Sequence, residues 1–462
     1  MTPTAALLAL SFALGAPAAG PPPSPSELPS PVFGKVPLVW PAGPPSGVVL
    51  LLEGDGGWEP RMRELAAALA ADGSLVLGVD TARYLSGARR RRCVYAAGDL
   101  EVLSQSAQKA LHLPAYVHPV VVGYSSGATL AYAALAQAPA GTFAGGVGIG
   151  FCDDLATPVR LCAGEGLRSE RRGRDRQVVS PGPVRARWKL YAGTRDRSCR
   201  LDAARAFAAR VPGSEVVPVE GAGHDYSSAR GWIAGVRSDV VAMSQAARRP
   251  PAAPPEASPV SDLPVVEVAP VIQGNMLAIL VTGDGGWASI DRALADRLAG
   301  AGVGVVGLDS LRYFWSRKTP EQLGADLHRL VVHYCATWRR DRVLLLGYSR
   351  GADVLPVGVA HLGADVLDRV RLVALLGPSL DAELEIHVAD LFQGGPKGTP
   401  ILGDARAIPT ALLCVYGSEE SAESVCPLLA GRPATRVVAL PGGHHFDGDY
   451  DAVANLLLDA TR

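Results

Sequence analysis

The chain has 462 residues, with 44 Lys or Arg against 45 Asp or Glu, which gives a formal net charge of −1 at pH 7. This balance gives no electrostatic reason to expect a nucleic-acid partner. The length is typical of about two or three domains, each large enough to bury a core of its own.

The first predicted element is an export leader. Residues 5–19 form a short apolar stretch that ends in Ala16-Pro17-Ala18, a small-residue pattern typical of signal peptide cleavage. The stretch is too short for a permanent membrane span, although the lack of Lys or Arg before it leaves an uncleaved anchor as the alternative. We expect a signal peptide at residues 1–19, a Pro-rich spacer at 20–31 and export of the mature protein.

The two halves of the chain repeat four motifs in the same order. Each half has Gly-Asp-Gly-Gly-Trp after an apolar run, then Asp-x-x-Arg-Tyr, then Gly-x-Ser-x-Gly-Ala, and finally Gly-His near its end. The paired motifs begin at Gly54 and Gly283, Asp80 and Asp309, Gly123 and Gly347, and Gly223 and Gly443. Four collinear matches indicate a tandem duplication, with an N-terminal domain at 32–247, a Pro/Ala-rich linker at 248–264 and a C-terminal domain at 265–462.

Within each half, continuous apolar runs alternate with Ala- and Leu-rich segments of helical period. Continuous hydrophobicity is typical of strands that are buried on both faces of a parallel sheet. We therefore predict two α/β-hydrolase-like domains, each a mostly parallel sheet with helices on both faces. In the second half we expect strands at about 276–282, 303–308, 342–347, 371–376, 410–416 and 435–440. The Gly- and Pro-rich residues 379–408 follow the fourth strand, where α/β-hydrolase folds commonly insert a lid.

Seven cysteines fit an exported protein. Cys152 and Cys162 bracket one short loop, and Cys414 and Cys426 bracket another, so each pair is a candidate local disulfide. The sequence has no Cys-x-x-Cys pair and no histidine at zinc-ligand spacing from these residues. We expect neither a metal site nor a cofactor.

A nucleophile elbow is predicted at Gly347-Tyr348-Ser349-Arg350-Gly351. The apolar run Arg342–Leu346 leads into this motif and a segment that can begin a helix follows it, which is the strand, sharp turn and helix that present a nucleophilic serine. The flanking glycines suit a strained turn, in which a larger side chain would collide with the neighbouring strand or helix. We therefore predict Ser349 as the nucleophile.

A nucleophilic serine needs a base, and the base needs an acid to orient it. In α/β-hydrolases the chain order is serine, acid, histidine. The second half supplies this order with Ser349, a Glu-rich loop after the strand that ends near Tyr416, and His444. His444 is preferred to its neighbour His445 because only His444 has a counterpart in the first half, His224.

The acid of the second half is Glu420 or Glu423. Glu420 stands three residues after a glycine that ends the preceding strand, and Glu423 stands three residues before Cys426. Asp196 in the first half satisfies both spacings at once, so it cannot decide between them. We favour Glu420 slightly.

An oxyanion hole needs two backbone N–H donors, one after the nucleophile and one from the loop after a preceding strand. Arg350 supplies the first donor, and the Gly-rich loop Gly283–Trp287 supplies the second, for which we select Gly285. A phosphate-binding loop is the rival interpretation of these glycines, but no Lys-Ser/Thr follows them.

The first half also carries a serine, an acid and a histidine in the same order, namely Ser125, Asp196 and His224. They form either a second active site or a scaffold retained after duplication. In the second case this half would serve in docking, with Arg89–Arg92 and Arg168–Arg176 near anionic lipid headgroups. Solvated loops are the simpler interpretation of both arginine clusters.

The longest motifs resemble the bacterial virulence-associated VirJ/AcvB family. The resemblance rests on Gly-Asp-Gly-Gly-Trp and on the segments Asp309–Trp315, Gly347–Pro356 and Pro441–Tyr450. The second half is similar to this family throughout, and the whole chain, with its leader and two halves, resembles the longer AcvB form. Arg350 departs from the aromatic or amide residue expected after the serine, and the resemblance does not fix the acid loop.

The resemblance implies a periplasmic α/β-hydrolase-type protein with Ser349 and His444 at the family's serine and histidine positions. For AcvB-like members it implies hydrolysis of aminoacyl-phosphatidylglycerol, such as the lysyl or alanyl ester, at the membrane surface. Ser349 would accept the aminoacyl group, and His444 would protonate the leaving glycerol hydroxyl. Candidates for contact with a cationic aminoacyl group are Asp284, Asp353, Asp447 and Asp449.

Two alternatives stay open at this point. One is a non-catalytic periplasmic factor that binds a secretion apparatus or an exported protein, although such a factor would have no use for the order serine, acid, histidine in both halves. The other is an esterase or peptidase that acts on a soluble substrate.

Overall fold

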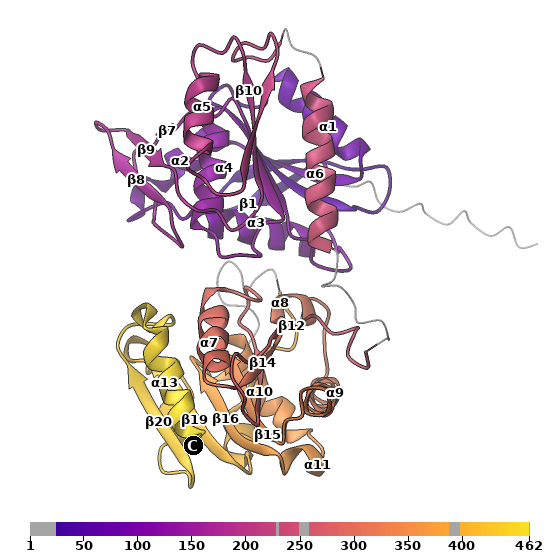
Figure 1. Cartoon of the computed structure of the whole chain (residues 1–462), viewed down its shortest axis with the longest axis vertical. Helices are drawn as coiled ribbons and strands as arrows, with labels where there is room; N and C mark the ends of the chain where they lie inside the picture. The colour runs from indigo at the N-terminus through magenta and orange to yellow at the C-terminus, as the bar shows by residue number, and fades with distance from the viewer. Residues whose placement is uncertain (1–24, 228–230, 249–257, 388–397, 462) are drawn as a thin grey trace, which may run out of the picture.

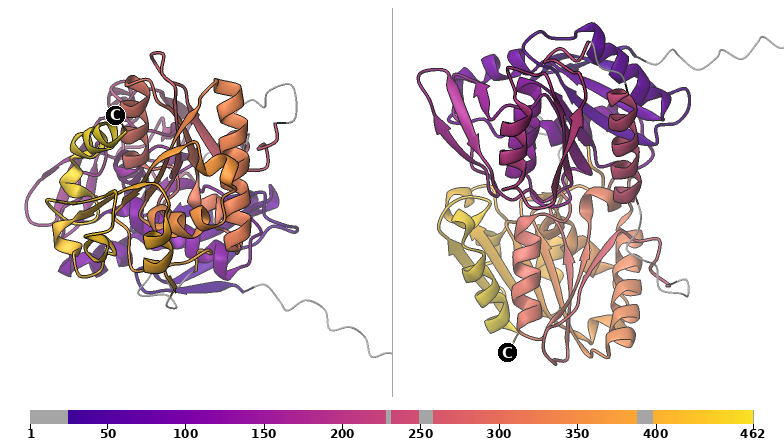
Figure 2. Two further views of the ribbon diagram at one scale, coloured as in Figure 1. Left: turned by 90° about the horizontal axis from the view of Figure 1, so that it is seen from below. Right: turned by 45° about the horizontal axis from the view of Figure 1, so that its top comes forward.

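The computed structural model describes residues 25–227, 231–248, 258–387 and 398–461. They form two α/β domains stacked end to end, with the N-terminal domain uppermost in Figure 1 and in the right-hand view of Figure 2. The predicted signal peptide lies outside the described residues. In the described part of the chain, no helix combines the length and the apolar character needed to cross a bilayer.

The N-terminal domain is built on an eight-stranded sheet of order β1-β2-β4-β3-β5-β6-β10-β11. It is parallel except where β2 pairs with β1 and with β4. Its strands are β1 (Glu27–Ser30), β2 (Gly34–Val39), β3 (Gly47–Leu52), β4 (Ser74–Val79), β5 (Val120–Tyr124), β6 (Gly145–Ile149), β10 (Trp188–Gly193) and β11 (Ser214–Val219). A small antiparallel sheet lies beside it, of β7 (Asp154–Ala156), β9 (Arg176–Ser180) and β8 (Arg168–Arg171).

Helices cover both faces of the large sheet, as Figure 1 shows. One face is covered by α2 (Thr81–Gly87), η1 (Ala88–Arg90), α3 (Ala96–Ala110), α4 (Ser126–Gln137) and α5 (Leu201–Ala208). The other is covered by α1 (Pro60–Ala71) and α6 (Trp232–Arg248). All residues of β3, β4, β5 and β6 are buried, as continuous apolar runs require.

The C-terminal domain repeats this arrangement in a seven-stranded sheet of order β12-β14-β13-β15-β16-β19-β20, which is the N-terminal order without its first strand. Only β12 runs antiparallel to its neighbour. The strands are β12 (Val265–Val268), β13 (Met276–Val281), β14 (Gly304–Leu308), β15 (Arg342–Tyr348), β16 (Val370–Leu376), β19 (Ala411–Gly417) and β20 (Thr435–Leu440). All six strands predicted for this half are present.

Two helices, α7 (Ser289–Gly300) and α13 (Tyr450–Ala460), cover one face of the second sheet. The other face is covered by α8 (Ser310–Tyr313), α9 (Pro320–Trp338), α10 (Arg350–Ala360), α11 (Ala364–Leu367) and α12 (Leu402–Ala407). Short 3-10 turns are η2 (Ser418–Glu420), η3 (Cys426–Leu429) and η4 (Phe446–Gly448). Residues 388–397 of the predicted lid, 379–408, lie outside the described residues. Its described part contains α12 and the two-stranded ribbon of β17 (Asp381–Ala382) and β18 (Thr399–Pro400).

Two predicted boundaries differ from the structure. The spacer predicted at 20–31 includes β1, which pairs with β2 and whose Leu28 packs against the N-terminal core. The linker predicted at 248–264 extends too far, because Val260 and Leu263 are buried in the core of the C-terminal domain. Both boundaries were predicted from proline content. An edge strand such as β1 tolerates a proline, here Pro29, and a turn can place apolar residues between prolines.

The base of the N-terminal domain rests on the C-terminal domain. Trp315 Nε1 donates to the Leu113 carbonyl at 2.8 Å, and the Lys109 ammonium donates to the Trp315 carbonyl at 2.5 Å. Arg292 donates to the Ala140 carbonyl at 2.9 Å. The N-terminal partners precede β5 and β6, whereas the C-terminal partners follow β13 and β14. The N-terminal domain therefore covers the edge of the C-terminal sheet at which the parallel strands of that sheet end.

Three disulfides are formed, Cys93–Cys162, Cys152–Cys199 and Cys414–Cys426. The third disulfide confirms the predicted bridge between Cys414 and Cys426, whereas the predicted bridge between Cys152 and Cys162 is wrong. Cys152 follows β6 and Cys199 follows β10, and these strands are neighbours in the sheet, so their ends bring the two sulfur atoms together. Cys162 instead lies beside the segment of Cys93, where Val94 and Leu161 form a bridge.

Candidate active sites

Both predicted nucleophiles lie at sharp turns between a parallel strand and a helix. Ser349 joins β15 to α10 with φ 54° and ψ −123°, and Ser125 joins β5 to α4 with φ 54° and ψ −121°. A positive φ is strained for a residue other than glycine. A Cβ on Gly347 or Gly351 would overlap a backbone carbonyl, which explains why glycine flanks the serine. The predicted elbow geometry is thus present in both halves.

In the second half the structure brings three of the predicted residues together. His444 Nε2 lies 2.8 Å from Ser349 Oγ, and His444 Nδ1 lies 3.1 Å from Glu420 Oε2. Glu423 is exposed, and its backbone N–H donates to the Glu420 carbonyl. The geometry therefore selects Glu420 rather than Glu423 as the partner of His444.

The neighbouring His445 is held away from the serine. Its Nδ1 lies 3.0 Å from the Tyr348 hydroxyl, which also donates to the His444 carbonyl at 3.3 Å. Burial and the adjacent His444 lower the pKa of His445, while burial raises the pKa of Tyr348. His445 and Tyr348 therefore fix the backbone that carries His444.

The Gly-rich loop turns beside the serine, as an oxyanion loop must. A Cβ on Gly283 would lie 3.3 Å from the Cβ of Ser349, and the Gly286 N–H donates to the Gly283 carbonyl at 3.1 Å. Arg350 is the first residue of α10, where the helix itself offers no acceptor for the backbone N–H. Gly285 and Arg350 as oxyanion donors stay a prediction, compatible with this placement.

The Arg350 side chain has a position that the sequence did not indicate. It is 7% exposed, and its Nε donates to the Asp284 carboxylate in the Gly-rich loop. Its Nη1 donates to the Glu383 carbonyl at 2.8 Å and the Glu385 carbonyl at 3.2 Å. Arg350 thus ties the elbow to the Gly-rich loop and to the lid. The only sequence signal was its departure from the family pattern.

The aspartates proposed for a cationic group mostly have other contacts. Asp284 binds Arg350, and Asp449 caps α13 by accepting from the Ala452 N–H at 2.9 Å. Asp353 accepts from the Ser379 N–H at 2.6 Å, and burial raises its pKa to about 7. Asp447 lies in η4 with φ 51°. These carboxylates hold the loops around the site.

The first half contains an equivalent and more buried arrangement. His224 Nε2 lies 3.0 Å from Ser125 Oγ, and His224 Nδ1 lies 2.8 Å from Asp196 Oδ2. The other carboxylate oxygen of Asp196 accepts from the N–H groups of Ser198 at 2.9 Å and Cys199 at 2.8 Å. The Asp196 side chain is completely buried.

Asp196, Cys199 and His224 also form the one group of potential metal ligands found in the described part of the chain. The Cys199 sulfur is bonded to Cys152, so it offers no thiolate. His224 is already hydrogen-bonded to Asp196 through Nδ1 and to Ser125 through Nε2. A hydrogen-bonded triad therefore accounts for this cluster better than a metal site does.

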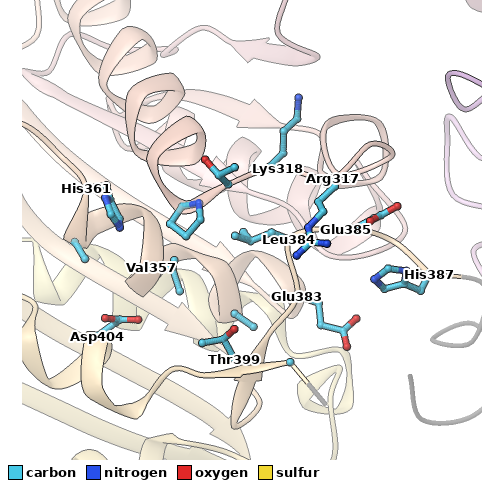
Figure 3. Close-up of a pocket in the computed structure, with 15 residues that line it drawn as sticks. Arg317, Lys318, Val357, His361, Glu383, Leu384, Glu385, His387, Thr399 and Asp404 are labelled. Atoms are coloured by element: carbon cyan, nitrogen blue, oxygen red, sulfur yellow. The ribbon is translucent and has the colours of Figure 1, made fainter. Parts of the chain in front are cut away.

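A cavity of about 620 Å³ lies between the lid, the start of α9 and the second half of α10. Figure 3 shows Glu383, Glu385, Arg317, Lys318 and Asp404 around it, so its lining mixes both charges. The predicted catalytic residues do not line it. It shares the segment from Glu383 to Glu385 with the contacts of Arg350.

The two arginine clusters differ in structure. Arg91 pairs with Asp99, beside η1. The segment Arg168–Arg176 is the exposed hairpin of β8 and β9, in which Arg176 pairs with Asp154. The second cluster is therefore not a plain loop, although its arginines are solvated.

The chain matches one protein family and is similar to several solved structures. A family model described as bacterial virulence protein (VirJ) matches residues 46–143 and 275–462. No curated protein matches the chain. Similar solved structures include an esterase domain from a Rhodothermus marinus protein (16% identity, TM-score 0.32, 46% of this chain and 92% of that one). Others are Est1E from Butyrivibrio proteoclasticus (14%, 0.32, 42% and 92%) and an alpha-beta serine hydrolase homologue from Coxiella burnetii (16%, 0.31, 47% and 94%).

Proposed function

The chain belongs to the VirJ family of bacterial virulence proteins, and we propose that it is a periplasmic serine hydrolase that cleaves the aminoacyl ester of lysyl- or alanyl-phosphatidylglycerol. The products are phosphatidylglycerol and a free amino acid, and the activity contributes to membrane lipid homeostasis and virulence. The observation that carries the proposal is the hydrogen-bonded series Ser349, His444 and Glu420 on a strained elbow.

Each group in that series has a role in acyl transfer. Ser349 Oγ attacks the ester carbonyl carbon while His444 Nε2 takes its proton, and Glu420 stabilises the resulting imidazolium. The backbone N–H groups of Arg350 and Gly285 donate to the oxyanion. His444 then protonates the leaving glycerol hydroxyl. Water, deprotonated by the same histidine, attacks the aminoacyl-enzyme and releases the amino acid.

The charge of the acid loop supports a cationic acyl group. Glu419 and Glu423 are exposed on either side of Glu420. Glu419 lies close to the histidine loop, since a Cβ on Gly443 would be 3.5 Å from its carboxylate. These carboxylates favour the ammonium groups of an aminoacyl ester by about 1 kcal/mol or less each where solvent screens them. An exported location is supported by the three disulfides, which persist in oxidising compartments.

The test is release of free amino acid from phosphatidylglycerol vesicles that contain lysyl- or alanyl-phosphatidylglycerol, with the purified mature protein and its Ser349→Ala variant. We expect the substitution to lower kcat by about 10⁴-fold or more, because removing a triad nucleophile leaves only the binding and oxyanion contributions. Ser125→Ala is the matched control, since it makes the same change at the corresponding turn of the other half.

The outcomes separate the open alternatives. Undiminished release by Ser349→Ala would contradict the serine mechanism at this site. Cleavage of soluble aminoacyl esters without release from vesicles would replace the lipid with a soluble substrate. Failure to cleave either class by a folded protein would favour the non-catalytic factor that binds a secretion apparatus.

A further inference from the structure

The N-terminal domain has a catalytic geometry of its own that the proposed function does not use. We propose that Ser125, His224 and Asp196 form a second, independent hydrolytic site, which takes carboxylic esters that carry a negative charge on their acyl group. The inference does not depend on the substrate of the C-terminal site.

The acid of this site is built more completely than its counterpart. Asp196 is buried and accepts from the N–H groups of Ser198 and Cys199 on one oxygen and contacts His224 on the other. The side chain of Glu420, by contrast, is 29% exposed. A buried carboxylate is costly unless donors compensate for lost hydration. A domain kept only as a scaffold would have no need to retain this buried charge.

The surrounding loops hold the triad rigidly. The Tyr124 hydroxyl donates to the His224 carbonyl at 2.7 Å, shorter than the matching contact in the C-terminal domain. The disulfide between Cys152 and Cys199 ties the acid loop to the loop after β6. In that second loop, a Cβ on Gly150 would lie 3.4 Å from the His224 ring. The geometry is therefore pre-organised for catalysis before substrate binds.

The site opens away from the domain interface. The triad lies where the parallel strands β5, β10 and β11 end, whereas the contacts with the other domain precede β5 and β6. The triad therefore lies at the end of the N-terminal domain that faces away from the C-terminal domain. Substrate therefore need not cross the domain interface to reach Ser125.

The acid loops of the two halves have opposite charges. Residues 193–200 read Gly-Thr-Arg-Asp-Arg-Ser-Cys-Arg, and the matching residues 417–424 read Gly-Ser-Glu-Glu-Ser-Ala-Glu-Ser. Arg200 is bonded to Asp202, but the exposed side chains of Arg195 and Arg197 make no hydrogen bond or ion pair with the residues that the structure describes. Two guanidinium groups without a partner in the described part of the chain thus stand on either side of the triad acid in the sequence.

Negative charge also lies near the triad. Asp225 follows the catalytic histidine, the Glu59 carboxylate lies beside Gly56 of the Gly-rich loop, and burial together with Glu59 and Asp225 raises the pKa of Tyr124 to about 12. Ser227 donates to Asp225, which also lies near Arg61. An anionic group is therefore favoured near Arg195 and Arg197, with which it can form charge-assisted hydrogen bonds, rather than near Asp225 and Glu59.

The reaction is the hydrolysis of a carboxylic ester to an acid and an alcohol. Ser125 Oγ bonds to the carbonyl carbon as its proton passes to His224. Collapse of the tetrahedral intermediate breaks the carbon–oxygen bond of the ester, and His224 gives the proton to the leaving alcohol. Water then adds to the acyl-enzyme, losing its proton to His224, which returns it to Ser125 as the acid leaves.

The first test is covalent labelling with a fluorophosphonate probe, which reacts with activated serines, followed by peptide mass spectrometry. In the full-length Ser349→Ala variant we expect stoichiometric labelling of Ser125. The Ser125→Ala variant should label only at Ser349. Lack of labelling at Ser125, in Ser349→Ala protein that unfolds at the same temperature as the parent, would overturn the proposal.

The second test measures acyl charge preference in the Ser349→Ala background. The 4-nitrophenyl monoester of succinate is compared with 4-nitrophenyl butyrate, which has a neutral acyl group of the same length. We expect Arg195→Gln with Arg197→Gln to lower kcat/KM for the succinate ester by about tenfold and to change butyrate hydrolysis by less than about twofold, since each screened contact contributes a fraction of a tenfold step. Equal losses of kcat/KM on both esters would refute the anion preference. The Ser125→Ala substitution should abolish hydrolysis of both esters, which assigns these activities to the N-terminal site.

Discussion

At the scale of single residues, Glu420 and Glu423 lie on the same loop, but only Glu420 contacts His444. We expect Glu420→Gln to lower kcat of the C-terminal site by about 10³–10⁴-fold, because the amide cannot stabilise the imidazolium and favours the wrong tautomer. Glu423→Gln should lower kcat by less than about threefold. The measurement is ester hydrolysis in a Ser125→Ala background, which isolates this site. A larger effect of Glu423→Gln than of Glu420→Gln would reverse the assignment.

Arg350 is predicted to act by positioning. Arg350→Gln keeps the backbone N–H at the start of α10 but loses the ion pair with Asp284 and weakens the hold on the Glu383 and Glu385 carbonyls. We expect kcat/KM to fall by about tenfold, through a displaced Gly-rich loop and lid. Asp284→Asn should produce part of the same loss, and the double variant should lose less than the product of the single effects. If the loss of kcat/KM in the double variant equals the product of the two single losses, the ion pair between Arg350 and Asp284 is not what positions the loop.

The same residues show what sequence could predict at this scale. Ser349 and His444 follow from a local motif and from chain order, and the first half supported the choice of His444 over His445. The part played by Arg350 could not be predicted, because its carbonyl partners lie 33 and 35 residues along the chain and are presented by the folded lid. The choice of Glu420 required the loop conformation, since two spacings in the sequence favoured different residues.

At the scale of elements, the disulfide between Cys414 and Cys426 closes the loop that carries Glu420. Replacing both cysteines with Ala should lower the free energy of unfolding by about 3 kcal/mol for a loop of 12 residues. The kcat should fall as well, because the acid becomes less well fixed. Urea unfolding of the oxidised protein and steady-state kinetics measure the two effects.

The matched control for that variant is Cys335→Ala, which removes a buried cysteine that forms no disulfide. It should cost about 1 kcal/mol or less and leave kcat unchanged. An unfolding curve for the double variant that coincides with that of Cys335→Ala would contradict a stabilising role for the bridge.

Strands and disulfides could be predicted from the sequence where the residues that determine them lie close together in the chain. Four strands of the second half, β13, β14, β15 and β16, are apolar and buried along nearly their whole length, and continuous hydrophobicity predicted them. The bridge between Cys152 and Cys199 was missed because it depends on which strands become neighbours, and 47 residues separate its cysteines. β1 was missed because Pro29 suggested a spacer, although an edge strand can accommodate it.

At the scale of the whole molecule, two acidic groups lie where the N-terminal domain covers the C-terminal domain, of which Asp309 is buried and Glu101 is partly buried. Glu101 of α3 approaches Asp309, the residue that caps α8. Burial and Asp309 raise the pKa of Glu101 to about 7, and burial raises the pKa of Asp309 to about 6. The nearby His118 stays neutral, because burial and Arg312 lower its pKa to about 4. The interface therefore favours protonated carboxyls.

The sign of the resulting pH dependence follows from linkage. In the unfolded chain the two carboxyls ionise near their ordinary pKa values of 4.5 and 3.8, below their values in the folded protein. Between about pH 4 and pH 7 these two carboxyls therefore hold more protons in the folded state than in the unfolded chain, and raising the pH removes the stability that they contribute. His118 offsets part of this loss, because its pKa is lowered from 6.5 to about 4 and the unfolded chain binds its proton more readily. We expect the free energy of unfolding to fall by on the order of 1 kcal/mol per pH unit across this window.

The variant Glu101→Gln with Asp309→Asn tests this origin, because its neutral amides keep the shape of both groups and Asn can still cap α8. Urea unfolding at closely spaced pH values should give a flatter dependence for this variant, with the largest gain in stability over the parent near pH 7. Glu64→Gln with Asp451→Asn, exposed acids away from this contact, is the matched control and should keep the parent slope. A parent slope that persists in the interface variant would mean that other groups set the pH dependence. A flatter dependence of the unfolding free energy on pH in this variant would show that the N-terminal domain is held most firmly over the C-terminal site at mildly acidic pH.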